Sequence, residues 1–109
     1  MAIQLKTEDY RSVAGTSLTG ALANVGAVTA SPGRVIVLFN GCNAEVIVSW
    51  DGGTTEGFLL PASSAVAIDG PTNNDTQEVV PFLPVKSQFQ AKHNGVAPTS
   101  GTLTITVVT

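Results

Sequence analysis

The fold of this chain is decided by residues 34–60, which read RVIVLFNGCNAEVIVSWDGGTTEGFLL. Three segments of strand length within them are rich in β-branched, aromatic and aliphatic side chains: residues 34–40, 45–50 and 54–60. The intervening GCNA (41–44) and DGG (51–53) are rich in residues that tolerate turn conformations. Because no helix-forming segment separates the strands, a parallel sheet is disfavoured and antiparallel pairing is predicted.

The strand pattern continues toward the C-terminus. Two-residue alternation, typical of a half-buried strand, runs through residues 64–69, 85–92 and 102–109. The sets expected to share a face are Val66 and Ile68, then Val85, Ser87, Phe89 and Ala91, and finally the inward-facing Leu103, Ile105 and Val107. The last segment is expected to present Thr102, Thr104 and Thr106 outward. Residues 77–84 contain Pro81 and Pro84, which suits a sheet edge or a bend.

Residues 1–31 show little strand signal. Three aliphatic residues within 17–28 have helical spacing, but two glycines in that stretch each weaken a helix by about 1 kcal/mol. We therefore predict a loop-rich N-terminal arm at 1–31, with room for a short strand, followed by one domain at 32–109. The arm either lies across a neighbouring subunit or folds locally over its own domain. Removing residues 1–20 is expected to unfold the domain only if the arm folds over its own domain.

These segments together predict an all-β fold: an antiparallel β-sandwich or small barrel, jelly-roll-like, of six to eight strands. The 109 residues have a net charge of −3, and 12% of them are charged, about half the usual share. The basic residues are scattered, so nucleic acid is not expected as a partner; they are Lys6, Arg11, Arg34, Lys86 and Lys92.

Neither a disulfide nor a membrane segment is expected. The single cysteine cannot form an intrachain disulfide. The first ten residues lack a basic start followed by an apolar run, and no stretch approaches the ~18 apolar residues that cross a bilayer. We therefore expect synthesis in the cytoplasm and no membrane partner.

The sequence contains no constellation that indicates catalysis, and we expect no enzyme activity, cofactor or metal site. His93 lies in a turn-forming HNG sequence, and Cys42 has no basic neighbour that would lower its pKa. One cysteine and one histidine cannot form a zinc site. Asp51 is expected to start a turn. Trp50 is either a core residue or a platform for a sugar.

Residues 38–69, LFNGCNAEVIVSWDGGTTEGFLLPASSAVAID, and PTSGTLTITVV at 98–108 resemble small structural proteins of tailed bacteriophages. The shared pattern is an Asn turn, an apolar strand ending in S-x-D-G-G/T-T, a Leu-Pro-Ala bend, an aliphatic strand ending in Asp, and a final P-x-S-G-x-L-x-I strand. Cys42 and the prolines at 81 and 84 depart from this pattern. The resemblance covers about half of the chain. It implies a β-sandwich of the virion, without catalytic residues, found as a head decoration or cement protein or as a neck or tail component.

We therefore expect a non-enzymatic capsid decoration or cement protein that stabilises the head and resides in the virion after synthesis in the bacterial host cytoplasm. The alternatives are a head–tail connector, neck or tail component and, from another class, a carbohydrate- or surface-binding module. The expected partners are other copies of the chain, with a trimer implied by the resemblance, and the major capsid protein or another virion protein. The aliphatic residues of the arm need an apolar surface to pack against. The outward threonines of the last segment form an uncharged face, which suits a contact with another subunit. The candidate partner-binding residues are Leu5, Val13, Leu18, Leu22, Thr102, Thr104 and Thr106.

Overall fold

The computed structural model describes residues 7–31, 33–51, 57–69, 83 and 86–109, and the statements that follow concern this part of the chain. It contains eight strands and one short 3-10 helix. Their bounds are β1 Arg11–Ala14, η1 Gly15–Ser17, β2 Ala23–Asn24, β3 Val35–Asn40, β4 Val46–Ser49, β5 Phe58–Leu60, β6 Ser64–Asp69, β7 Gln90–His93 and β8 Thr102–Val108. The all-β prediction is confirmed.

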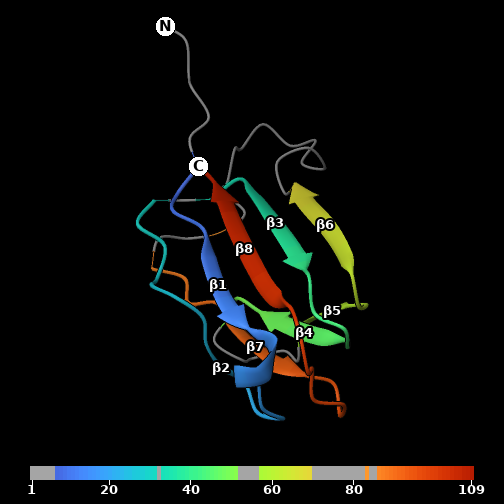
Figure 1. Cartoon of the computed structure of the whole chain (residues 1–109). Helices are drawn as coiled ribbons and strands as arrows, with labels where there is room; N and C mark the ends of the chain where they lie inside the picture. The colour runs from blue at the N-terminus through green and yellow to red at the C-terminus, as the bar shows by residue number, and fades with distance from the viewer. Residues whose placement is uncertain (1–6, 32, 52–56, 70–82, 84–85) are drawn as a thin grey trace, which may run out of the picture.

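The strands form two four-stranded sheets in the orders β1-β8-β3-β6 and β2-β7-β4-β5, here called the front sheet and the back sheet (Figure 1). All pairs are antiparallel, and they are nested: β1 pairs with β8, β2 with β7, β3 with β6 and β4 with β5. Further pairing of β3 with β8 and of β4 with β7 joins these couples into sheets. The predicted antiparallel sandwich is therefore confirmed.

The core lies between the two sheets and consists of alternate side chains from their strands. The members with 0% exposure are Ile36, Leu38, Cys42, Val46, Val48, Leu83, Phe89, Ala91, Leu103, Ile105 and Val107. The inward set predicted for β8 is confirmed, and its alternation with outward threonines places one side of that strand in the core. Val66 and Ile68 of β6 are half-buried and pack against the same cluster.

The segment predicted as a strand at 85–92 is regular only from Gln90 onward, and β7 extends to His93. The strand is shorter than predicted because the residues before it pair with a segment that is distant in the sequence. The backbone of residues 86–89 hydrogen-bonds to the segment 25–29: Val25 N donates to Phe89 O, Thr29 N to Ser87 O, and Lys86 N to Thr29 O. Lys86 itself has a positive φ of 64°, which interrupts an extended strand. Phe89 and Ala91 are nevertheless buried on one side as predicted, whereas Val85 and the prolines at 81 and 84 lie outside the described residues.

The N-terminal segment packs on both sheets of its own chain. β1 forms the edge of the front sheet beside β8, and β2 forms the edge of the back sheet beside β7. Leu18 and Val25 between and after these strands are 8% and 2% exposed and belong to the core. Residues 7–31 therefore have the arrangement expected of an N-terminus that folds over its own sandwich.

Candidate interaction surface

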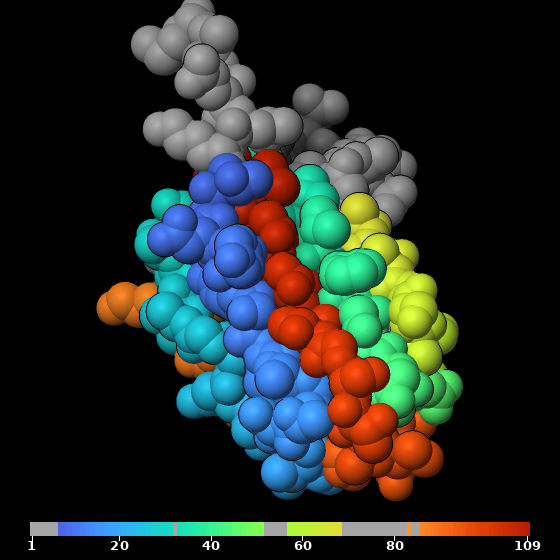
Figure 2. Space-filling model, in the orientation of Figure 1, coloured from blue at the N-terminus to red at the C-terminus, as the bar shows by residue number. Residues whose placement is uncertain are grey.

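The outer side of the front sheet is the broadest regular surface of the described chain. Alternation along each strand and the register between strands place eleven side chains on it: Ser12, Ala14, Val35, Val37, Phe39, Ala65, Ala67, Thr102, Thr104, Thr106 and Val108. We call this set the front face. In Figure 2 the four strands lie side by side across one surface, with β8 and β3 at its centre.

The front face is mostly apolar and hydroxyl-bearing. Seven of these eleven side chains are valine, alanine or phenylalanine and four carry a hydroxyl group, while the register also pairs Val35 with Asp69 at the end of β6. Phe39 is 50% exposed and lies opposite Thr104 on β8 and Ala65 on β6. A large exposed apolar side chain at the centre of a sheet face that is poor in charge is typical of a protein contact surface, because charged residues are depleted where interfaces are driest.

The structure places the predicted partner-binding residues in two different environments. Thr102, Thr104 and Thr106 lie together on the front face. The residues of the N-terminal segment do not join them: Val13 is half-buried on the inner side of β1, Leu18 is buried in the core and Leu22 is half-buried. Leu5 lies outside the described residues. The threonines are therefore accessible to a partner, while Leu18 is occupied within its own chain.

Three further members of the front face, Val35, Val37 and Phe39, were missed as contact residues because their strand looks continuously apolar in the sequence. Which side of β3 faces the core becomes clear from its register, in which Ile36 and Leu38 lie opposite the buried Val107 and Ile105. The polar Asn40 gives a misleading signal, because it is 0% exposed and lies on the inner side of β3 with Ile36 and Leu38.

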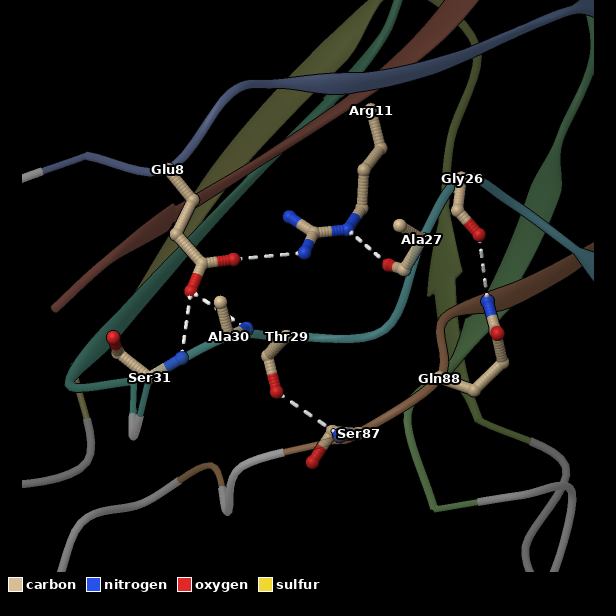
Figure 3. Close-up of polar contacts among 9 residues, drawn as sticks. All are labelled: Glu8, Arg11, Gly26, Ala27, Thr29, Ala30, Ser31, Ser87 and Gln88. Carbon is tan, nitrogen blue, oxygen red and sulfur yellow. Dashed lines mark hydrogen bonds and ion pairs between the residues drawn. The ribbon is translucent and has the colours of Figure 1, made fainter.

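A charged cluster closes the side of the sandwich next to β1 (Figure 3). Arg11 is 7% exposed; its Nη2 donates to Glu8 Oε1 at 2.8 Å and its Nε donates to Ala27 O at 2.8 Å. The second carboxylate oxygen, Glu8 Oε2, accepts hydrogen bonds from the backbone N–H groups of Ala30 and Ser31, both at 3.0 Å. The guanidinium also lies over the ring of Phe89, 5.4 Å from its centroid, a favourable cation–π geometry.

A one-residue irregularity in the strand makes this ion pair possible. Thr7 lies opposite Val108 and Arg11 opposite Ile105, so four residue steps in the first segment match three on β8. Such an extra residue is a β-bulge. In a regular strand, residues three apart point to opposite faces. The bulge brings Glu8 to the same side as Arg11, where the two side chains meet.

The environment of Glu8 favours its charged form. Burial by itself raises the pKa of this carboxyl group. The hydrogen bond from Arg11, those from the backbone of Ser31 and Ala30, and the positive charge of Arg11 outweigh burial, so the pKa lies below its usual value. Gly26 makes room for this arrangement: it has a positive φ of 66°, and a Cβ there would lie 2.7 Å from Cγ of Arg11. The cluster ties the segment 26–31 to β1.

Comparisons of the chain with protein-family models, with curated proteins and with solved structures found no match.

A buried asparagine organises the opposite end of the front sheet. Asn40 is 0% exposed, and its Nδ2 lies 3.1, 3.2 and 3.0 Å from the carbonyl oxygens of Ala44, Leu60 and Pro61. Its Oδ1 accepts a hydrogen bond from Cys42 N at 3.0 Å. One side chain therefore holds the turn after β3 and the end of β5 together, a role that its position in a turn-like sequence did not reveal.

The residues considered for chemistry lie on different elements: His93 ends β7, Cys42 lies in the turn after β3, and Trp50 and Asp51 follow β4. His93 is half-buried in β7; its backbone N–H donates to Thr19 O at 2.9 Å, and no carboxylate of the described residues hydrogen-bonds its ring. Cys42 is buried, and this burial raises the pKa of its thiol, which disfavours the reactive thiolate. Asp51 accepts a hydrogen bond from Ser49 Oγ at 2.9 Å. Trp50 is half-buried and packs against the core.

Two hollows are formed by described residues. The larger, about 600 Å³, lies between residues 7–12 and 26–30, with Tyr10 (69% exposed) and Val28 (43% exposed) among its lining residues. The smaller, about 170 Å³, is lined by Ser49, Trp50, Asp51, Gly57 and Phe58. Within the described ranges, no three histidine, cysteine, aspartate or glutamate side chains gather as a metal site. No helix in the described part of the chain is long and apolar enough to cross a bilayer.

Proposed function

We propose that this protein is a non-enzymatic structural component of a tailed-bacteriophage virion, of the capsid decoration or cement type. In this proposal it binds neighbouring subunits through the front face, and the neighbours are other copies of the chain and the major capsid protein or another virion protein. The observation that supports it most directly is the mostly apolar front face, with the half-exposed Phe39 between Thr104 and Ala65.

The strand order gives a second line of support. Nested pairing of β1 with β8, β2 with β7, β3 with β6 and β4 with β5 suits assignment as a jelly roll, an eight-stranded double-sheet architecture of viral capsid and lectin domains. The resemblance of residues 38–69 and 98–108 to phage structural proteins favours the virion over the other uses of this architecture. A fold alone does not determine function, so the front face remains the main support.

A carbohydrate-binding function is the second candidate, because the smaller hollow has suitable chemistry. Trp50 and Phe58 provide aromatic surface, and Asp51 and Ser49 provide polar groups beside them. Binding to a glycan array that is lost in Trp50→Ala, while the front-face variant Phe39→Lys still binds, would establish this second candidate instead of the first.

The test of the virion function is the composition of particles. Tailed particles are purified from cells that encode the chain, by density gradient, and their proteins are quantified by mass spectrometry. We expect the chain in stoichiometric amounts with the major capsid protein, and an image reconstruction to show a sandwich-sized density on the head. Absence of the chain from particles that are otherwise complete would reject the virion function, and density at the neck or tail would move it to the connector alternative.

A matched pair of substitutions tests the role of the front face in that setting. Phe39→Lys introduces a charge at the centre of the front face, whereas Leu59→Lys introduces one at a similarly exposed position of β5 in the back sheet; the two native side chains are 50% and 45% exposed. We expect particles to lose the Phe39→Lys protein and to retain the Leu59→Lys protein. Equal retention of both would show that another surface makes the contact.

A further inference from the structure

We propose that Asn94 is a site of spontaneous deamidation: the backbone nitrogen of Gly95 attacks the side-chain amide of Asn94, which becomes aspartate or isoaspartate. The site lies in the bend after β7 and does not depend on the function proposed for the front face. The sequence contains one other Asn-Gly pair, Asn40–Gly41, and we propose that the fold protects this second pair from the same reaction.

The reaction needs water as its only co-reactant. Gly95 N forms a bond to Cγ of Asn94, the Cγ–Nδ2 bond breaks, and Nδ2 leaves as ammonia with the proton that Gly95 N has lost. Water then opens the resulting succinimide ring at one of its two carbonyl carbons. Opening at Cγ gives aspartate, and opening at the main-chain carbonyl carbon gives isoaspartate. Asparagine before glycine favours ring closure, because glycine has no Cβ to crowd the attacking nitrogen.

Asn94 and Gly95 lie where this ring can close. Both residues are exposed. In the part of the chain that the structure describes, the Gly95 N–H donates no hydrogen bond, and a Cβ at Gly95 would meet no atom within 4 Å. The Asn94 side chain is held by one surface contact, in which Nδ2 donates to Oε1 of the exposed Glu45 at 3.1 Å. Water can replace that contact, so both reacting groups are available in the folded chain.

Asn40 and Gly41 have the same sequence and the opposite environment. Asn40 is 0% exposed, and its Nδ2 lies within hydrogen-bonding distance of three backbone carbonyl oxygens. The Gly41 N–H, which would have to lose its proton, donates to Thr102 O at 2.9 Å. Local unfolding must therefore precede reaction at this pair. We expect Asn40 to react about 100-fold or more slowly than Asn94 in the folded chain.

Deamidation of Asn94 places a negative charge opposite Glu45. Val46 lies opposite His93 in the pairing of β4 with β7, and Glu45 and Asn94 are the next residues on each side. The Asn94 N–H donates to Glu45 O at 3.3 Å, so the two residues remain adjacent beyond the strand ends. A carboxylate would replace the amide that donates to Glu45, and like charges directly opposite each other are destabilising. The reaction therefore weakens this end of the back sheet.

The experiment is peptide mapping of the folded full chain after storage in mildly alkaline buffer. Trypsin cleaves after lysine and arginine, so residues 93–109 form one peptide, and Asn94 is its only amide side chain. A mass increase of about 1 Da in that peptide therefore reports Asn94 alone. We expect this increase, with two products of equal mass that separate by chromatography. An unchanged 93–109 peptide overturns the proposal.

Asn40 is the internal control of the same digest. It lies in the tryptic peptide 35–86 and is followed by fragment masses. We expect no conversion of Asn40 in the folded chain while Asn94 reacts, and similar rates at both residues in concentrated urea, where the buried hydrogen bonds are lost. Equal rates in the folded chain overturn the proposed protection.

Two variants test the attack by Gly95 N. Gly95→Ala adds a methyl group beside the attacking nitrogen in otherwise open space, and should slow conversion of Asn94 about tenfold or more. Asn94→Gln keeps an amide but would need a larger ring, and should remain unmodified. Circular dichroism verifies that both variants are folded. Direct hydrolysis by water does not involve Gly95 N, so wild-type rates in either variant overturn the proposed route.

Asn94→Asp measures the effect of the added charge. We expect its Tm to lie about 1–4 °C below that of the wild type. In a Glu45→Gln background the same substitution should leave Tm unchanged, because the opposing carboxylate is absent. An equal decrease in both backgrounds contradicts the repulsion between positions 45 and 94.

Discussion

Replacing Asn40 by alanine should destabilise the domain more than any single loss of a surface hydrogen bond. The substitution leaves the buried N–H of Cys42 without its acceptor and removes the donor that serves the carbonyl oxygens of Ala44, Leu60 and Pro61. An orphaned buried donor costs about 1–3 kcal/mol, and each lost hydrogen bond contributes about 1 kcal/mol. Because carbonyl oxygens tolerate partial satisfaction better than N–H groups, we expect a total loss of about 3 kcal/mol.

The assay is thermal and urea unfolding followed by circular dichroism. For a chain of 109 residues, 1 kcal/mol corresponds to about 4 °C in Tm, so Asn40→Ala should melt about 12 °C below the wild type. The control is Asn43→Ala. Asn43 is exposed, with its side chain 2.7 Å from Thr99 Oγ1 and 3.0 Å from Thr99 N, and water can replace both partners. We expect that control to lose less than about 1 kcal/mol. Equal losses in the two variants would refute the reasoning that burial makes these bonds costly to break.

Three further predictions concern the charged cluster, a close backbone approach and the N-terminal segment. Because the pKa of Glu8 is lowered in the folded state, its stabilising contribution is complete above the usual glutamate pKa and is lost as pH falls through the folded value. The Tm difference between the wild type and Glu8→Gln should therefore be largest near pH 7 and shrink toward pH 3; a difference constant across that range contradicts the role of the carboxylate. Gly101 and Gly95 both have positive φ, at 91° and 86°, but a Cβ at Gly101 collides with the carbonyl group of Gly41, whereas a Cβ at Gly95 meets nothing within 4 Å. Gly95→Ala should cost about 1–2 kcal/mol and Gly101→Ala clearly more in urea unfolding, and similar costs would show that the contact can relax. Deletion of residues 1–20 removes β1 and the core residue Leu18 and should abolish cooperative unfolding in calorimetry, whereas a sharp transition after the deletion would show that the segment is dispensable.

The strands that the sequence predicted best are those whose pattern is local. β3, β4, β6 and β8 have apolar side chains at strand spacing, so their existence could be predicted without knowledge of their partners. β1 has the sequence RSVA and pairs with β8, 88 to 94 positions further along the chain. A segment stabilised by so distant a partner has no signal of its own, because its extended form depends on tertiary pairing.

Only the β8 part of the candidate surface could be predicted, because only its pattern is local. The outward threonines of β8 follow from alternation alone, and the structure places all three on the front face. Their neighbours on β3 require the register between β3 and β8, in which Phe39 lies opposite Thr104. The contact between Glu8 and Arg11 was not predictable, because residues three apart on a strand point to opposite sides unless a bulge intervenes.

The nested order of the strands also determines when the molecule can be completed during its synthesis. The inner couple, β4 and β5, is separated by few residues and can pair soon after it leaves the ribosome, whereas β1 must wait for β8. At about 5–20 residues per second, the interval between Arg11 and Val108 takes about 5–20 s. During that time β1 lacks its partner strand. Because the threonine row of β8 is the last part of the front face to be made, neighbouring nascent chains on one polysome cannot associate through a finished front face before β8 has been synthesised.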